Sequence, residues 1–139
     1  MIAFPGRPVA RQILSLMLLT GASGGAIADW IKVAELETGS IYADPDSIRR
    51  DGDLVKMGTL YDLKVPISSK TNGKRYVSQK LQGEYDCREE QWRILYFSWH
   101  SRNMGGGEMV EYLADAYKWE PVPAGSGVEI LRHFACGKK

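Results

Sequence analysis

Apolar and polar residues alternate along the middle of the chain. The alternation is cleanest over residues 76–87, where Val77, Leu81, Tyr85 and Cys87 fall on one side and polar residues fall on the other. A period of two is typical of a β-strand that packs one face against a core. Similar patterns, including a run that is apolar on both faces, predict further strands over residues 30–36, 40–43, 53–63, 92–101 and 109–119. The last of these also allows a short helix.

The periodicity changes near the C-terminus. Ser126-Gly127-Val128-Glu129 has the form of a capping box, and the apolar residues that follow recur at helical spacing. This pattern predicts one helix. We expect the helix to end near Ala135, because Cys136 would point away from the apolar stripe of a longer helix.

Loops separate the predicted elements. Polar or glycine-rich residues predict loops over residues 68–75 and 102–108, and Asp44-Pro45 predicts a turn or a single helical turn. Strands first and a helix last indicate the α+β class. We expect a small antiparallel sheet of about five to six strands, with one C-terminal helix packed on the face that holds Leu81 and Tyr85.

The start of the chain has a composition of its own. Two arginines precede an apolar run over residues 13–20, and small residues then lead to Ala28. This layout predicts a secretory signal peptide over residues 1–28 and a single exported domain over residues 29–139, in the periplasm or at the cell surface. The apolar run is shorter than the roughly 20 residues of a membrane span. We expect no transmembrane segment after the signal is removed.

Charge narrows the class of partner. The chain has 18 basic and 17 acidic residues, a net charge of +1. Residues 1–28 hold two of the arginines, so 16 basic and 17 acidic residues remain without them, a net charge of −1. This balance disfavours nucleic acid, which requires a strongly positive surface.

The two cysteines, Cys87 and Cys136, lie far apart in the sequence. In an oxidising compartment such a pair most often forms one structural disulfide. The alternative is a zinc site completed by His100 and His133, but the spacings fit no known zinc pattern. We therefore expect a disulfide, no metal and no cofactor.

The sequence offers little for catalysis. Ser98 and His100 are close, but no third group is evident to orient the histidine, so we interpret His100 as structural. Four aspartates between residues 44 and 53 fit caps and turns better than a calcium loop. We expect a protein that is not an enzyme.

Aromatic residues are the most informative candidates for binding. Trp92 and Tyr96 fall on one face of their predicted strand, opposite Phe97 and Trp99. If the helix leaves one of these faces bare, that face is suited to a protein partner or to a second copy of the chain. The candidate binding residues are Trp92, Tyr96, Arg75 and Arg102.

Several short segments follow one another in a definite order along residues 30–136. They are Trp30, Ile41-Tyr42-Ala43-Asp44-Pro45-Asp46-Ser47-Ile48, the strand from Leu54 to Leu63, Glu84-Tyr85-Asp86-Cys87 with Trp92-Arg93, and Trp119-Glu120-Pro121-Val122 with Ser126 and Cys136. Together they resemble the surface-adhesin protein E family of Gram-negative bacteria. The resemblance implies a small antiparallel sheet with a C-terminal helix, joined cysteines, and adhesion to host extracellular-matrix and serum proteins.

We therefore expect an exported, non-enzymatic binding protein that acts as a bacterial surface adhesin for host matrix or serum proteins. The alternative is a periplasmic structural or assembly factor, which would bind an envelope partner by strand addition at a sheet edge. In both cases the partner is a protein, and a homodimer is compatible with a bare aromatic face.

Overall fold

The computed structural model describes residues 29–137, so the predicted signal peptide, residues 1–28, lies outside the described residues. The elements are β1 (Ile31–Leu36), β2 (Gly39–Asp51), β3 (Leu54–Ser68), β4 (Arg75–Asp86), β5 (Gln91–His100), the 3₁₀ turn η1 (Asn103–Gly105), β6 (Met109–Leu113), β7 (Glu120–Pro121) and α1 (Gly127–Gly137). The predicted antiparallel sheet with one C-terminal helix is confirmed. The sheet has seven strands, slightly more than the five to six we expected.

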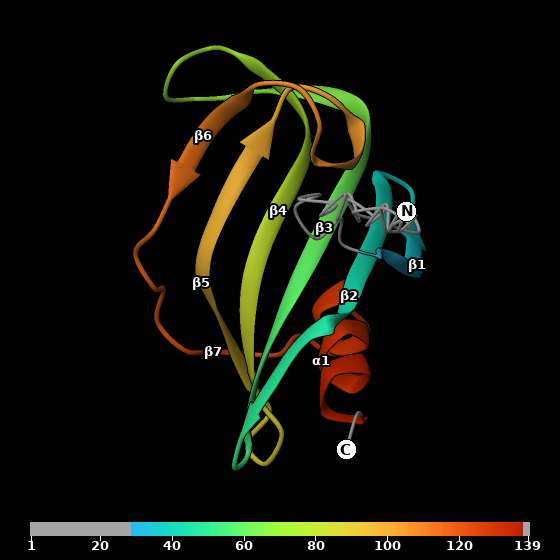
Figure 1. Ribbon diagram of the computed structural model, residues 1–139, viewed down its shortest axis with the longest axis vertical. Helices are drawn as coiled ribbons and strands as arrows, with labels where there is room; N and C mark the ends of the chain where they lie inside the picture. Colours follow the sequence, from blue (N-terminus) through green and yellow to red (C-terminus); the bar gives the residue numbers. More distant parts are fainter. Residues whose placement is uncertain (1–28, 138–139) are drawn as a thin grey trace, which may run out of the picture.

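The strands pair in the order in which they follow along the chain, from β1 to β6, and every pairing is antiparallel (Figure 1). The short β7 also pairs with β5, at the opposite end from β6. The continuous strand predicted over residues 109–119 is therefore wrong. The chain leaves the sheet after Leu113 and touches β5 through Tyr117, whose N–H donates to Ile94 O at 2.8 Å. This gap lies beside an irregularity in β5, where regular pairing cannot continue.

β2 continues through Asp44-Pro45, where we expected a turn, so that prediction is wrong. Its register with β3 shifts between Asp44 and Arg49, where four residues of β2 lie opposite one residue of β3. Asp44 Oδ1 accepts a hydrogen bond from Asp46 N at 3.1 Å, and Ser47 Oγ accepts one from Gly58 N at 2.7 Å. The turn-forming residues thus build a bulge, because pairing with β3 continues on both sides of it.

The helix α1 packs against one face of the sheet, which we call the helix face (Figure 1). From its apolar stripe, Leu131 and Ala135 are fully buried. The buried sheet residues of the same cluster are Ile41, Ala43, Val55, Met57 and Tyr85. The prediction that the helix covers the Tyr85 side of β4 is confirmed. Burial of a leucine side chain contributes about 2 kcal/mol, so Leu131 is a principal anchor of the helix.

The ring of Tyr85 lies along its own strand, over Gly83. A Cβ atom at position 83 would stand 2.8 Å from Tyr85 Oη and 3.0 Å from the nearest ring carbons. Tyr85 is fully buried and stacks on Trp92, with 6.3 Å between ring centroids, so its ring has little freedom to move aside. Gly83 is therefore required at this position. Burial also raises the pKa of the Tyr85 phenol and raises that of Tyr61 to about 12.

A disulfide joins Cys87, just after β4, to Cys136 in the last turn of α1, with 5.6 Å between the Cα atoms. The predicted pairing is confirmed, but the predicted helix end near Ala135 is wrong, because α1 continues to Gly137. Both cysteines are partly buried at the rim of the core, so a residue at the flank of the apolar stripe can reach its partner. One turn earlier, Arg132 Nε donates to the Asp86 carbonyl at 2.8 Å. Two successive turns of α1 are thus held at the end of β4.

Candidate binding surface

The face of the sheet opposite α1 carries no α-helix within residues 29–137, and we call it the open face. Strand register assigns its side chains to rows that cross the sheet. Its three central rows, read from β2 towards β6, are Tyr42, Leu60, Lys80, Ser98 and Tyr112; Asp44, Gly58, Gln82 and Tyr96; and Arg49, Lys56, Glu84 and Arg93. Antiparallel sheets commonly leave one such polar face to the solvent.

The turn η1 covers one end of the open face. Asn103 Nδ2 donates to Asp62 Oδ1 at 3.0 Å, and Gly105 N donates to Ser78 Oγ at 2.9 Å. Gly105 adopts a positive φ of 73°, which suits a residue without a side chain. The predicted glycine-rich loop is confirmed, and hydrogen bonds attach it to β3 and β4.

Trp92 and Tyr96 lie on opposite faces of β5, so the prediction that they share a face is wrong. The register between β4 and β5 shifts after the Gln82–Tyr96 pair, because β5 contains one extra residue, Leu95. Such a bulge reverses the alternation of side chains beyond it. Trp92 pairs with Tyr85 on the helix face and packs against the core, whereas Tyr96 lies on the open face and is 46% exposed.

A second exposed tyrosine accompanies Tyr96. Tyr112 of β6 pairs with Ser98, two residues along β5 from Tyr96, and is 55% exposed. The two tyrosines are thus diagonal neighbours on the open face. We did not predict Tyr112, because in the sequence it signals only a preference for strand. Phe97, in contrast, pairs with Leu81 on the helix face.

The other two predicted residues, Arg75 and Arg102, lie at the end of the sheet where β4 begins and β5 ends. Both side chains are exposed. Arg75 lies seven residues along β4 from the partner of Tyr96, which is about 23 Å in an extended strand. The structure therefore does not gather the four predicted binding residues into one site. Of the four, we place Tyr96 on the central open face.

In the three central rows of the open face, some charged side chains form an ion pair and others do not. Glu84 is buried, and its Oε1 accepts from Arg93 Nη2 at 2.6 Å and from Arg93 Nε at 2.7 Å. The Arg93 guanidinium also stacks over the ring of Trp119, 4.7 Å from its centroid. Lys56 and Lys80 are exposed, and neither forms an ion pair with another residue of the described range 29–137. Sequence reasoning missed both lysines, although they occupy polar positions of alternating strands.

Ser98 and His100 form a buried pair on the open face, with 2.7 Å between Ser98 Oγ and His100 Nε2. Burial, and secondarily the charge of Lys80, lowers the pKa of His100. A catalytic histidine would need an acid to orient it. The nearest acid in the row of His100 is Asp62, whose carboxylate accepts hydrogen bonds from the η1 turn and not from His100. The pair is consistent with the interpretation of His100 as structural.

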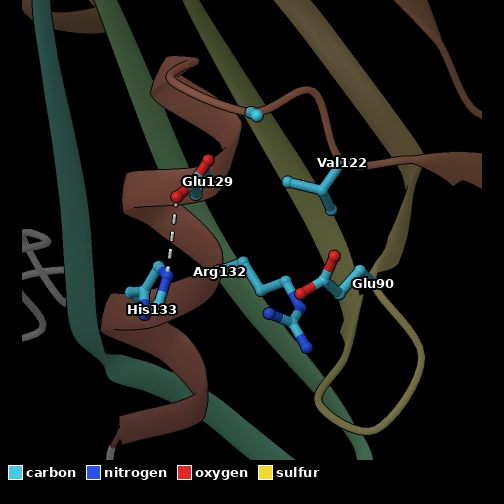
Figure 2. A pocket seen from close by; sticks show the side chains of 6 residues that line it. Glu90, Val122, Glu129, Arg132 and His133 are labelled. Carbon is cyan, nitrogen blue, oxygen red and sulfur yellow. Dashed lines mark ion pairs between the residues drawn. The ribbon is translucent and has the colours of Figure 1, made fainter.

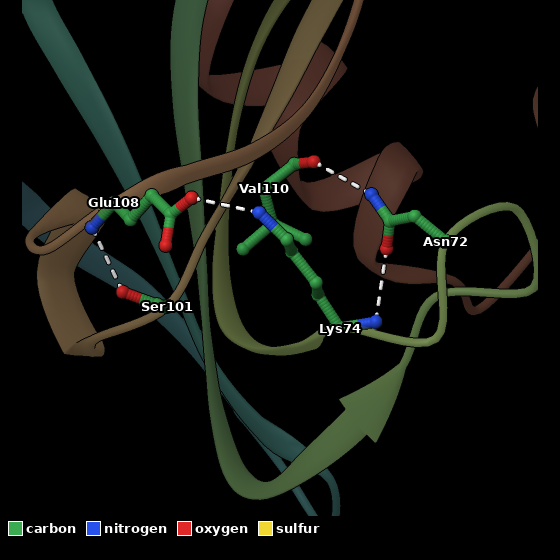
Figure 3. A network of polar contacts seen from close by, with 5 residues as sticks. All are labelled: Asn72, Lys74, Ser101, Glu108 and Val110. Carbon is green, nitrogen blue, oxygen red and sulfur yellow. Dashed lines mark hydrogen bonds and ion pairs between the residues drawn. The ribbon is translucent and has the colours of Figure 1, made fainter.

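The outer edge of β6 is partly closed by the loop of residues 69–74 (Figure 3). Asn72 Nδ2 donates to Val110 O at 3.0 Å, and Lys74 Nζ lies 2.9 Å from Glu108 Oε1. An edge strand whose carbonyl is already paired is a poorer template for another strand. These contacts therefore disfavour strand addition at β6.

A hollow of about 190 Å³ lies beside α1, and Figure 2 shows its lining. The Glu90 carboxylate and the Arg132 guanidinium point toward one another across it, and His133 Nε2 lies 3.9 Å from Glu129 Oε1. The charged groups of its lining are the carboxylates of Glu90 and Glu129 and the guanidinium of Arg132. A second hollow, of about 280 Å³, lies at the other end of the sheet beside residues 63–67 and is mainly apolar.

Two further observations concern the described part of the chain. Within residues 29–137, no three His, Cys, Asp or Glu side chains are grouped so that they could hold a metal ion. In the same range, no helix combines the length and the apolar character needed to cross a bilayer. The described residues form a small antiparallel sheet with one disulfide-linked helix on one face, and the other face is free of α-helix.

The chain belongs to the surface-adhesin protein E family, whose model matches residues 30–137. The resemblance noted in the sequence is thereby confirmed, and a surface-adhesin family is not a class of enzymes. No curated protein matches the chain.

Solved structures of Haemophilus influenzae protein E share the fold. One superposes with a TM-score of 0.59 at 12% identity and covers 81% of this chain and 87% of its own. A second crystal form gives a TM-score of 0.61 at 12% identity, with 81% and 91% covered. Protein E from non-typeable Haemophilus influenzae gives 0.57 at 12% identity, with 82% and 79% covered. At this identity the similarity establishes the fold alone.

Proposed function

We propose that this chain is an exported surface adhesin that holds a protein partner against its open face. Family membership supports the adhesin class. The disulfide and the signal-like composition of residues 1–28 support export followed by folding of a single domain. The observation that carries the proposal is the pair of exposed tyrosines, Tyr96 and Tyr112, on the face that α1 leaves open.

Tyrosines on a rigid sheet are effective anchors. Each offers a large apolar ring and a polar tip, and few rotatable bonds have to be fixed when it is bound. Trp92 is less available, because it packs against the helix-face core. Arg75 and Arg102 remain candidates for peripheral contacts at the end of the sheet. We propose host matrix or serum proteins as the partners, on the strength of family membership.

Cell-surface exposure can be tested by protease treatment of intact cells, followed by mass spectrometry of the released peptides. Peptides around Trp92 and Trp119 should be released while a known periplasmic protein stays intact. If they are released only after the outer membrane is broken, the adhesin proposal fails. The periplasmic alternative, in which a partner strand adds to the outer edge strand β1, would then take its place.

The binding face can be tested with purified protein and immobilised matrix and serum proteins. Replacing two anchors, as in Tyr96→Ser/Tyr112→Ser, should weaken binding about tenfold or more. Tyr117→Ser is the matched control, since Tyr117 is 42% exposed but its ring lies against Phe97, 6.2 Å between centroids. Equal binding by all three proteins would rule out the open face as the contact surface.

A further inference from the structure

We infer that the open face binds an acidic polypeptide segment of its partner. This inference rests on the proposed function, because it specifies the chemistry of the partner at the same face. Its starting point is the charge of the three central rows, which hold four cations and two carboxylates. The cations are Arg49, Lys56, Lys80 and Arg93, and the carboxylates are Asp44 and Glu84.

The carboxylates of these rows are already engaged. Glu84 is buried against Arg93, which accounts for one cation. Asp44 Oδ1 accepts the backbone N–H of Asp46 within the β2 bulge. Within residues 29–137 neither acid forms an ion pair with the two exposed lysines of these rows. The pairing of Glu84 with Arg93 leaves three cations, Arg49, Lys56 and Lys80, against one carboxylate, Asp44, whose contact with a neutral N–H does not compensate its charge.

The remaining cations form no ion pair within residues 29–137, although Asp51 lines the same hollow as Arg49 and Lys56. Lys56 and Lys80 are exposed and form no ion pair within residues 29–137. Arg49 Nη1 donates only to neutral carbonyls, those of Asp46 and Ile48, at 2.9 and 2.8 Å. These contacts orient the guanidinium but leave its charge uncompensated, so carboxylates of a partner would complete the pairing.

The cations flank a central row that holds Tyr96 and, at its β2 end, Asp44. Gln82 and Tyr96 form the row between Lys56 and Lys80, and Tyr112 lies diagonally beyond. A partner segment that alternates acidic and apolar side chains matches this arrangement. A sulfated polysaccharide or a nucleic acid requires a continuous positive track, which this face lacks.

The test measures binding of the oxidised protein to a Glu-Ala repeat peptide, with a Gln-Ala repeat peptide as the uncharged reference. Lys56→Gln/Lys80→Gln should weaken binding of the Glu-Ala peptide about tenfold at low salt. Lys70→Gln/Lys74→Gln removes the same charge from the loop of residues 69–74 and should bind like the parent. High salt should abolish the difference between the two variants, because the contacts are exposed.

Four results would overturn the inference. One is equal binding of the Glu-Ala and Gln-Ala peptides, and another is equal loss in both lysine variants. The third is tighter binding of heparin or single-stranded DNA with the same dependence on Lys56 and Lys80. The fourth is matrix-protein binding that depends on Tyr96 but not on the lysines. That result would rule out an acidic partner segment and leave the proposed function intact.

Discussion

Removing the disulfide is the perturbation with the most direct expected effect on stability. In Cys87→Ser, α1 keeps its buried anchor Leu131 but loses its covalent link to the end of β4. The cysteines are 49 residues apart in the sequence. The crosslink lowers the conformational entropy of the unfolded chain, and for a loop of this size it stabilises the folded state by about 4 kcal/mol. The variant should fold with the same sheet and unfold more readily.

The assay is thermal unfolding followed by circular dichroism. A loss of about 4 kcal/mol in a domain of this size lowers Tm by roughly 15 °C. The parent protein in reductant should show a similar drop, and the sulfhydryl of Cys136 in the variant should become reactive to alkylation. Cys87→Ser/Cys136→Ser controls for the single unpaired thiol.

The reasoning fails if the variant and the oxidised parent differ in stability by less than about 1 kcal/mol, since the loop constraint alone demands more. It also fails if reductant leaves the Tm of the parent unchanged while Cys136 becomes reactive. Either result would mean that the unfolded chain is already compact around the two cysteines.

Three further predictions follow from buried contacts. Gly83→Ala should destabilise the protein by about 2 kcal/mol in urea unfolding, because the new methyl group overlaps the immobile Tyr85 ring; equal stability would show that the ring moves freely. Arg93→Met should cost roughly 3 kcal/mol by leaving the buried Glu84 carboxylate unpaired, and adding Glu84→Gln should recover most of the loss, whereas additive losses would contradict the pairing. The pKa of His100 is lowered in the folded protein, so the unfolded chain binds protons more readily and stability should fall as the pH drops from about 7.5 to about 5.5. Replacement of His100 by Gln should reduce that slope, and an unchanged slope would assign the pH dependence to other groups.

The elements that the sequence predicts correctly are those with strong local signals. The alternation along β4 and the capping box before α1 arise from contacts within one strand or one helical turn. The pairing of Cys87 with Cys136 was predictable because export leaves few alternatives for two distant cysteines. Local physics was sufficient for these features.

The errors come from contacts between strands. The extra residue Leu95 in β5 becomes a bulge only in register with β4, so alternation alone placed Trp92 and Tyr96 on one face. Asp44 has the local chemistry of a turn, but pairing with β3 on both sides keeps it in a strand. Of the two aromatic binding residues predicted on β5, Tyr96 is exposed on the open face and Trp92 packs against the core.

The disulfide also determines which strands would carry a mechanical load. Tension applied between residues 29 and 137 runs through β1 to β4, crosses from Cys87 to Cys136, and leaves at the end of α1. Strands β5 and β6, which carry Tyr96 and Tyr112, lie outside this path. In a molecule pulled from these two residues, the strands that carry Lys56 and Lys80 would bear the load, whereas β5 and β6 would lie in the loop that the disulfide closes. In single-molecule pulling, reduction should release about 170 Å of additional chain.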